Sequence, residues 1–287
     1  MSPSFTTVRR VLNAASYLSP RLFGGYVFRL FCEPQSRDTV REAQRPVHDQ
    51  AVVEELTTDG RRLVTYRWGD GERPVVLLHG FGGRAANFAG FVHALNRSGI
   101  SAVSYDAYGH GDSGGRNVTV LDHLAVLREL QERHGPFRAI IGHSFGGTSA
   151  YLALRRGIKA DRLVSIASEG DFGALPGLFC HQLGLRQSYA GELRRRSEEL
   201  FAAEPDFWHE FSPVHRPEEI SQPLLVVHDK KDREVGVAQG RAIAEAYGDR
   251  ARLLETDGLG HRRILGDPAV ITHVLTFVAG GDTTPIA

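Results

Sequence analysis

The segment at residues 137–156, FRAIIGHSFGGTSAYLALRR, contains a serine in a setting that could make it a nucleophile. An apolar run, Ala139–Ile141, leads into GHSFG at residues 142–146, and a helical pattern follows at once. A hydroxyl such as that of Ser144 becomes reactive on a tight strand-to-helix turn with a base nearby. The same spelling, G-x-S-x-G, recurs as GDSGG at residues 111–115, so the motif alone does not identify the nucleophile.

The elements around the two serines distinguish them. Ser144 follows a predicted strand directly, lies between glycines, and precedes a predicted helix whose N-terminal amides would face an oxyanion. Ser113 lies several residues beyond its strand, and the helical pattern resumes only near Thr119. GDSGG also resembles the serine segment of chymotrypsin-like proteases, but that fold needs an all-β chain, and this sequence alternates strand and helix. Ser144 is therefore the predicted nucleophile.

His261 is the predicted general base among the thirteen histidines. It lies in TDGLGHRRIL, after the last predicted strand, in a loop at the carboxyl edge of the sheet. A base there can reach Ser144 and take its proton during attack. His143 should project elsewhere from a sharp turn, and His79 and His110 belong to glycine turns. The alternative for His261 is a capping or surface role.

An imidazole base needs a carboxylate that holds its tautomer and stabilises its cation. The segment LLVVHDKKDREV offers Asp229 and Asp232 beyond the predicted strand at 224–227. We favour Asp232, because Asp229 lies too near the strand end to turn over it easily. The alternative for Asp232 is a solvated or turn-stabilising role.

Two backbone amides would have to stabilise the oxyanion of a tetrahedral intermediate, and losing one such donor typically costs about 3 kcal/mol. The amide of Phe145, which follows the predicted nucleophile, is one candidate. The other is the amide of Phe81 in HGFGG, the loop after the predicted strand at 74–78. Both phenyl rings would then line the pocket floor. The alternative for Phe81 is an ordinary core aromatic.

The elements that must position these groups alternate between strands and helices. Ala51–Leu56 and Arg62–Trp68 predict an antiparallel hairpin at the start of the fold. The further predicted strands are Pro74–Leu78, Ala102–Tyr105, Ala139–Ile141, Leu163–Ile166, Leu224–Val227 and Ala251–Leu254. Predicted helices lie near 85–97, 119–134, 144–156, 237–247 and 268–279. Short apolar strands joined by helices predict a doubly wound α/β fold, with a mostly parallel sheet covered on both faces.

Residues 169–218 interrupt this alternation, because they contain helix-forming runs and many aromatics but no convincing strand. A long apolar insertion at the carboxyl end of a strand predicts a helical cap over a pocket. We assign Phe172, Phe179 and Trp208 to the wall of that pocket; the alternative is a surface excursion. The predicted organisation is an N-terminal helical segment packed on the core (1–48), the core itself (49–168 and 219–287) and the cap (169–218).

The N-terminal segment at residues 6–31 predicts two short amphipathic helices with arginines on one side. Polar and charged residues interrupt it, so we expect no integral membrane span and no secretory signal. We expect these helices to pack on the domain or on a partner subunit, which leaves a homodimer open. The alternative is attachment to a membrane surface.

The overall composition gives no support to several classes of function. A formal net charge of zero over 287 residues gives no global field that would attract nucleic acid or anionic lipid. Cys32 and Cys180 form no metal-site or disulfide pattern, so we expect a reducing, cytoplasmic location. Arg84 and Ala85 stand where a phosphate-binding loop would have Lys and Ser/Thr, and no cluster of metal-ligating residues stands out in the sequence. We therefore expect no cofactor and no metal.

Five segments, VVLLHGFGG, SYDAYGHGDSGG, IGHSFGG, VVHDKKDREV and GLGHRRIL, occur in the order seen in the alpha/beta-hydrolase superfamily. The sequence resembles that superfamily from about residue 50 to 280, and looks like a bacterial branch of compact hydrolases of mostly unassigned substrate. The resemblance implies the alpha/beta-hydrolase fold with a small helical cap. It also implies that Ser144, Asp232 and His261 are catalytic and that Phe81 and Phe145 are oxyanion donors.

Tyr108 is a departure from the pattern, since many relatives carry Arg at this position of D-x-R-G-x-G. With Tyr108 at this position, the turn is not expected to pack as it does in those relatives, whereas the predicted triad is unaffected. A serine at position 144 argues against the chemistry of haloalkane dehalogenases, which use an aspartate nucleophile.

The predicted function is a serine hydrolase that cleaves an ester or thioester, or a lactone, of a medium-sized apolar acid. Its partner would be this small-molecule substrate, with no nucleic acid. The same triad could instead serve an acyltransferase, a carbon–carbon bond hydrolase or a biosynthetic cyclase. A further alternative is a non-catalytic small-molecule-binding protein on the same fold.

Overall fold

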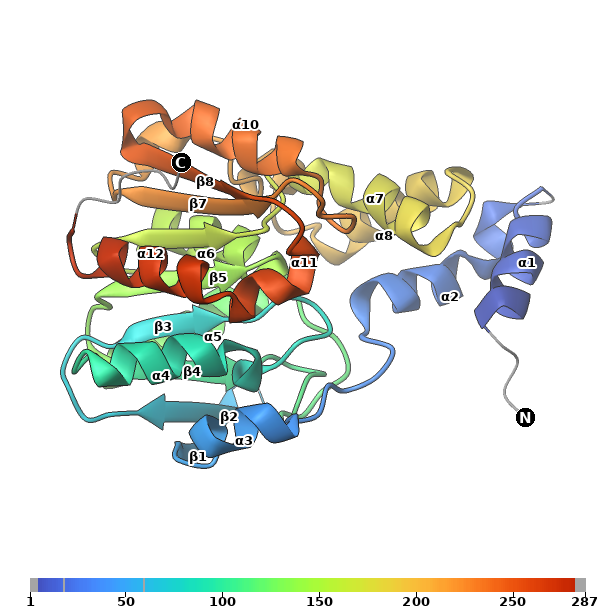
Figure 1. Ribbon diagram of the computed structural model, residues 1–287. Helices are drawn as coiled ribbons and strands as arrows, with labels where there is room; N and C mark the ends of the chain where they lie inside the picture. The colour runs from blue at the N-terminus through green and yellow to red at the C-terminus, as the bar shows by residue number, and fades with distance from the viewer. Residues whose placement is uncertain (1–4, 18, 59, 282–287) are drawn as a thin grey trace.

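The computed structural model describes residues 5–17, 19–58 and 60–281. Within these residues, eight strands form one sheet in the order β1-β2-β4-β3-β5-β6-β7-β8 (Figure 1). Their bounds are β1 (Val52–Thr58), β2 (Arg61–Trp68), β3 (Val75–Leu78), β4 (Ala102–Asp106), β5 (Ala139–His143), β6 (Leu163–Ile166), β7 (Leu224–Asp229) and β8 (Ala251–Thr256). β2 pairs antiparallel with β1 and β4, and all other neighbouring strands are parallel.

Helices cover both faces of this sheet, as the buried strands require. The helices of the described residues are α1 (Phe5–Ala15), α2 (Pro20–Cys32), α3 (Arg45–His48), α4 (Ala89–Arg97), α5 (Val120–His134), α6 (Phe145–Arg155), α7 (Leu175–Leu183), α8 (Ser188–Leu200), α9 (Phe207–Glu210), α10 (Val237–Tyr247), α11 (Gly260–Arg263) and α12 (Pro268–Val278). The predicted fold class, a mostly parallel α/β sheet with an antiparallel start, is confirmed.

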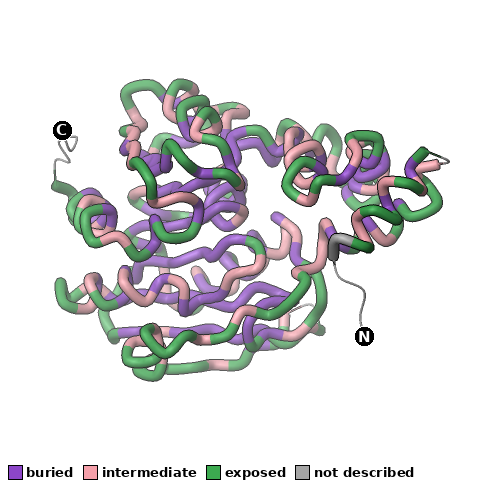
Figure 2. Tube along the Cα trace, turned by 45° about the vertical axis from the view of Figure 1, so that its right-hand side comes forward, coloured by how far each residue is buried: buried purple, intermediate pink, exposed green. Residues whose placement is uncertain are grey.

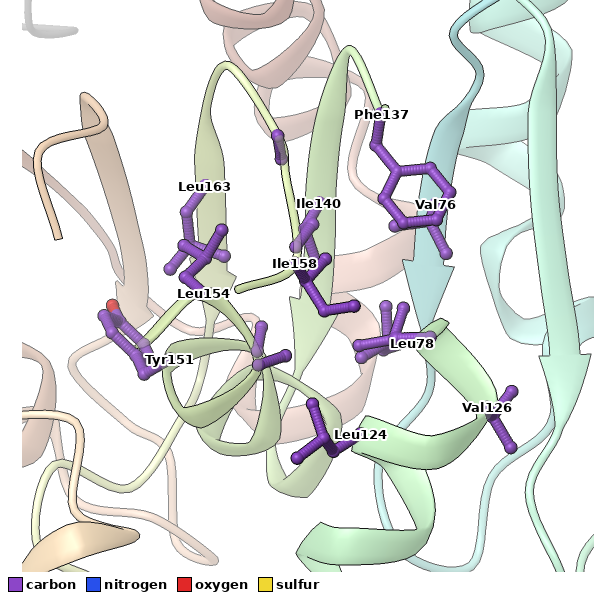
Figure 3. Close-up of a cluster of buried hydrophobic side chains, with 14 of the residues drawn as sticks. Val76, Leu78, Leu124, Val126, Phe137, Ile140, Tyr151, Leu154, Ile158 and Leu163 are labelled. Carbon is purple, nitrogen blue, oxygen red and sulfur yellow. The ribbon is translucent and has the colours of Figure 1, made fainter. Parts of the chain in front are cut away.

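Alternate residues of β3 show how the two apolar cores arise. Val76 and Leu78 pack in the cluster that contains side chains of α5 and α6 (Figure 3), and of α10. Val75 and Leu77 pack in the cluster that contains side chains of α4 and α12. Because β3 to β7 are buried on both faces, their sequences are mostly apolar and do not alternate between apolar and polar residues. Figure 2 shows the buried strands between exposed helical turns.

The order of the strands creates a binding crevice. After β3 the chain crosses to β4 on one side, and β5 then pairs with β3 on the other side. In open parallel sheets, ligands bind at the carboxyl ends of the strands where the winding reverses in this way. The loop after β3 and the turn after β5 meet at this point.

Helices α7, α8 and α9 lie between β6 and β7 in the sequence. α7 and α8 project beyond the carboxyl ends of the strands, with α1 and α2 beside them (Figure 1). A separate apolar cluster joins Leu12 of α1 and Val27 of α2 to Cys180, Tyr189 and Leu193 of α7 and α8. The first two helices therefore pack on the cap, and the predicted packing of this segment on the core does not hold for α1 and α2.

The pair α1–α2 is held to the cap by polar contacts as well. Asn13 Nδ2 donates to the carbonyl oxygen of Gly184 over 2.9 Å, and the hydroxyl of Tyr189 donates to the carbonyl oxygen of Leu12 over 2.9 Å. We call α1 and α2 together the N-terminal arm. No helix within residues 5–17, 19–58 and 60–281 combines the length and the apolar character needed to cross a bilayer.

Candidate active site

Ser144 lies on a strained turn between β5 and α6. Its φ of 51° and ψ of −125° belong to a region that L side chains rarely adopt. Its backbone N–H donates to the carbonyl oxygen of Ile166 over 2.8 Å, and α6 begins at the next residue. The partial positive charge of the N-terminus of α6 therefore lies beside this serine.

Glycines allow the close packing around that turn. A Cβ added to Gly146 would lie 2.5 Å from the carbonyl oxygen of Leu78. A Cβ added to Gly142 would lie 2.4 Å from the Cα of Gly147. Both contacts involve backbone, so no side chain could move aside to relieve them. The glycines that flank Ser144 in the sequence are therefore required by the approach of β3, β5 and α6.

His261, in the short helix α11, is held by Asp232. Its Nδ1 donates a hydrogen bond of 2.8 Å to Oδ2 of Asp232, and both side chains are buried. The other carboxylate oxygen, Oδ1, accepts from the backbone N–H groups of Glu234 and Val235 over 2.8 and 2.9 Å. The carboxylate therefore fixes the tautomer of the ring and leaves Nε2 as the nitrogen that can accept a proton.

The charges around His261 favour its protonated form. Burial lowers the pKa of His261, but the hydrogen bond and charge of Asp232 raise it, and Glu234 and Glu169 add to that effect. The net result is a pKa above the ordinary value. Oε2 of Glu234 lies 3.9 Å from Nε2. For Asp232, burial raises the pKa, but the hydrogen bond from His261 and its charge lower it below the ordinary value.

His143 connects the serine turn to the histidine loop. Its Nε2 lies 2.8 Å from the carbonyl oxygen of His261, and the centroids of the two rings are 4.8 Å apart. Burial lowers the pKa of His143 to about 3, so the ring is neutral and donates its Nε2 proton to that carbonyl. The residue before Ser144 thus supports the backbone of His261.

A cavity of about 430 Å³ brings the predicted site residues together. Ser144 and His261 both line it, as do Phe81 and Phe145. The cap contributes an apolar wall from Phe172, Leu175, Leu178, Phe179, Leu183, Leu200 and Phe201. The arm contributes Leu30, Phe31 and Cys32, which sequence reasoning missed.

Trp208 is the one predicted pocket residue that the structure places elsewhere. It does not line the cavity; its ring centroid lies 4.4 Å from that of Phe207 and 4.7 Å from the guanidinium carbon of Arg194. Its indole N–H donates to Oε1 of Glu198 over 3.3 Å. The polar edge of the indole is thus satisfied by another residue of the cap.

The two predicted oxyanion donors come from different elements. Phe145 is the first residue of α6, and Phe81 lies in the loop after β3. In that loop the N–H of Gly82 donates to Nε2 of His110 over 2.9 Å. Nδ1 of His110 lies 2.9 Å from the carbonyl oxygen of Tyr108 and therefore carries the proton. Burial lowers the pKa of His110 to about 3, so it is a neutral acceptor that holds the loop next to Phe81.

The serine of the second G-x-S-x-G segment has a structural role. The hydroxyl of Ser113 donates to the carbonyl oxygen of Asp106 and accepts from the N–H of Val64 over 2.8 Å. The ring of His79 likewise accepts a backbone hydrogen bond, from Ala107 over 2.9 Å. These side chains join the turn after β4 to its neighbours.

Glu169 is a buried carboxyl group in the cavity wall that sequence reasoning missed. The hydroxyl of Thr148 donates to its Oε2 over 3.0 Å, and burial raises the pKa of the carboxyl group. Its sequence signal is its position three residues beyond β6, at the carboxyl edge of the sheet. An ionisable group there is close enough to influence His261.

Asp229, the carboxylate not chosen as the partner of His261, organises the loop that leads to it. Its Oδ2 accepts from the hydroxyl of Thr256 over 2.7 Å and from the N–H of Leu259 over 2.9 Å. Its Oδ1 accepts from the N–H of Lys231 over 2.9 Å. Burial raises the pKa of Asp229, but these hydrogen bonds lower it to about 2.

The residues of the cavity have the chemistry that covalent catalysis by a serine needs. Among the described residues, no group of three or more His, Cys, Asp or Glu side chains is placed to hold a metal ion. The cavity instead combines a serine on a strained turn, an imidazole paired with a carboxylate, and an apolar wall. Such an arrangement can form and hydrolyse an acyl ester of the serine.

Residues 75–273, more than half of the chain, match the family described as the alpha/beta hydrolase family. Monoacylglycerol lipase of Mycolicibacterium smegmatis is 26% identical over 225 residues, which are 65% of this chain and 80% of that protein. The dihydrolipoyllysine-residue acetyltransferase component of the acetoin cleaving system of Cupriavidus necator is 30% identical over 178 residues, or 58% of this chain. The chain spans 46% of the length of that relative.

A solved structure with a similar fold covers nearly the whole chain. The structure of a bacterial membrane phospholipase A aligns with a TM-score of 0.62 and 18% sequence identity. The alignment covers 96% of this chain and 98% of the other.

Proposed function

This chain belongs to the alpha/beta hydrolase family, and we propose that it is a serine hydrolase that cleaves an ester or thioester of a medium-sized apolar acid. A lactone is the cyclic form of the same bond. The observation that carries the proposal is one apolar cavity shared by Ser144, on its strained turn, and His261, hydrogen-bonded to Asp232.

In the proposed mechanism, Nε2 of His261 takes the proton of the Ser144 hydroxyl as its oxygen attacks the substrate carbonyl carbon. The oxyanion that forms accepts hydrogen bonds from the amides of Phe81 and Phe145. The protonated His261 then gives its proton to the leaving alcohol or thiol, and Asp232 stabilises the imidazolium meanwhile. Water attacks the acyl-enzyme with His261 again as base, which releases the acid and restores the serine.

The apolar character of the cavity supports an apolar acyl group. Nine phenylalanine and leucine side chains of the cap and arm line it, and hydrophobic burial against them would contribute binding energy for each methylene of an acyl chain. The relatives named as a monoacylglycerol lipase and a phospholipase A act, by their names, on lipid esters, which is in keeping with this substrate class.

The decisive experiment compares wild type and Ser144→Ala on p-nitrophenyl esters of graded chain length. We expect kcat to fall by about 10⁴-fold or more, because the acyl-enzyme cannot form. A fluorophosphonate probe should label wild type, and mass spectrometry should map the adduct to the peptide of Ser144 and not to that of Ser113. Retained turnover in a folded Ser144→Ala protein would refute the proposal.

Acyl transfer is the second candidate, because one relative is named as an acetyltransferase component. The same acyl-enzyme would then be attacked by an alcohol or thiol instead of water. The two reactions are distinguished by the products of a single ester in the presence of a competing acceptor. Free acid as the main product supports hydrolysis, and a new ester or thioester as the main product supports transfer.

A further inference from the structure

The N-terminal arm exposes large apolar side chains to solvent. Val11 and Tyr17 are 54% and 75% exposed, and Leu22 and Phe23 are 66% and 40% exposed. Among the described residues, these four make up half of the eight large apolar side chains that are exposed. Scattered exposed apolar residues are normal, but their concentration on one short segment marks an interaction surface.

The same segment carries only positive charge. Residues 1–32 contain Arg9, Arg10, Arg21 and Arg29 and no Asp or Glu, although the whole chain is neutral. Arg10, Arg21 and Arg29 are exposed. None of these four arginines forms an ion pair with a residue that the structure describes. Their charges are therefore available to an external anionic partner.

The side of the arm that faces α7 and α8 is held by contacts with them. The exposed apolar and basic side of the arm therefore has a fixed position. Figure 1 shows α1 and α2 beside α7 and α8, away from the sheet. α2 approaches α8 closely at Gly24, where a Cβ would lie 2.4 Å from Cγ of Glu192. The guanidinium carbon of Arg186 lies 3.6 Å from the ring centroid of Tyr17, next to the start of α2. The exposed side chains are thus presented by a four-helix unit.

The arm also reaches the candidate active site. The last turn of α2 contributes Leu30, Phe31 and Cys32 to the cavity that contains Ser144. At 1.5 Å per residue, the exposed Phe23 lies about 12 Å along the helix from Phe31. One helix therefore runs from the exposed apolar and basic surface to the wall of the cavity.

We propose that the N-terminal arm docks on an anionic lipid bilayer and places the cavity where an acyl chain can enter it from the membrane. The apolar side chains would enter the headgroup region, and the arginines would bind lipid phosphates. The docking stands on the arm alone, whereas the delivery of a lipid ester rests on the proposed hydrolase function.

The charge of the arm indicates that its exposed surface binds a bilayer rather than a second copy of the chain. A two-fold symmetric contact through this surface would place one arm against the other, because such an interface uses the same patch on both subunits. The arginines of two segments without acidic residues would then repel each other. An anionic membrane supplies the opposite charge and an apolar layer together.

The test measures co-sedimentation of the full chain with vesicles of phosphatidylcholine, with or without phosphatidylglycerol. We expect wild type to bind the anionic vesicles, and to bind them less at high salt. Arg10→Gln and Arg21→Gln should each weaken binding about five-fold, and together more. The double variant Leu22→Ser/Phe23→Ser should weaken it about ten-fold or more.

Matched control variants lie on other faces. Val53 is as exposed as Val11 but belongs to β1, and Arg97 and Arg128 are exposed on α4 and α5. Val53→Ser, Arg97→Gln and Arg128→Gln should bind vesicles as wild type does. Absence of wild-type binding to anionic vesicles would overturn the proposal, and so would unchanged binding by Leu22→Ser/Phe23→Ser. A dimer that these arm variants dissociate, without vesicle binding, would assign the surface to a second copy instead.

Two further measurements separate docking from hydrolysis. Ser144→Ala should bind vesicles as wild type does, because the serine is not part of the arm surface. The arm variants should retain turnover of a soluble short-chain ester and lose turnover of a monoacylglycerol held in anionic vesicles. Vesicle binding without any esterase activity would leave the docking intact and refute the hydrolase.

Discussion

At the scale of single residues, the carboxylates around His261 control when it can act as a base. Asp232 is its hydrogen-bond partner, whereas Glu234 is about half exposed and lies 3.9 Å from the other ring nitrogen. Each negative charge stabilises the imidazolium and so raises the pKa of His261. Because the neutral ring is the base, ester turnover should rise with pH through a pKa above 6.5.

The variant Glu234→Gln tests this electrostatic role. Removing one negative charge should lower the pKa of His261, so the acidic limb of the kcat/KM profile should move to lower pH. The hydrogen bond from His261 to Asp232 remains, so the maximal rate should change little. A pH profile on a soluble ester measures both effects.

Glu55 supplies the matched control, because it is also exposed and paired with an arginine, Arg62, but lies on β1. Glu55→Gln should leave the pH profile where it is. An acidic limb that stays in place in Glu234→Gln, or that moves equally in both variants, would show that Glu234 does not act on His261.

At the scale of elements, Asp229 connects the end of β7 to the loop between β8 and α11. Its two oxygens accept from at least three donors, so an amide at this position would turn an N–H₂ group toward one or more of them. We expect Asp229→Asn to lower the free energy of unfolding by about 1–3 kcal/mol, the usual cost of unsatisfied buried polar groups. Activity should fall too, because the loop positions His261.

The pH dependence of stability gives a second measurement for Asp229. Its pKa is lowered to about 2 in the folded protein, below the ordinary value of 3.8. Its contribution to stability is therefore complete above the ordinary pKa and is lost as the pH falls toward 2. Asp257→Asn is the control, since Asp257 lies in the same region but is exposed beside Lys231. Equal unfolding midpoints for both variants in denaturant would contradict the assigned role.

The core elements could be predicted from the sequence because local signals specify them. The apolar residues of β3 to β7 indicate burial, and the glycines around Ser144 indicate close backbone contact. Both signals can be read from residue type alone. The helix predicted at 237–247 has the bounds of α10, because its apolar residues repeat at helical spacing against a single sheet face. The order of these strands along the chain then brings the loops after β3 and β5 together.

The surfaces of the cap and arm could not be predicted in the same way. Phe179 and Trp208 are both aromatic residues of helical segments, yet only Phe179 lines the cavity, because Glu198 and Arg194 hold the indole on the cap. The amphipathic pattern of the arm predicts helices but does not say what covers their apolar side. That depends on the shape of α7 and α8, which is a non-local property.

At the scale of the whole molecule, the cavity is assembled from three parts that are distant in sequence. The core supplies Ser144 and His261, the cap supplies Phe179, and the arm supplies Phe31. The rings of Phe31 and Phe179 meet edge to face, with centroids 5.2 Å apart. Such pairs contribute about 0.5–1.5 kcal/mol beyond the area that they bury. The arm and the cap are therefore expected to act as one wall.

Phe31→Ala tests whether that wall sets the preference for acyl chain length. The cavity should lose apolar contacts on its arm side, so kcat/KM for a long-chain ester should fall about ten-fold while that for an acetyl ester changes less than about two-fold. Phe179→Ala should act in the same direction. Because the two rings touch, the double variant should lose less than the sum of the two single effects in free energy, whereas Phe31→Ala with Val53→Ser should be additive. Additive losses for Phe31 and Phe179 would mean that arm and cap contact the substrate independently.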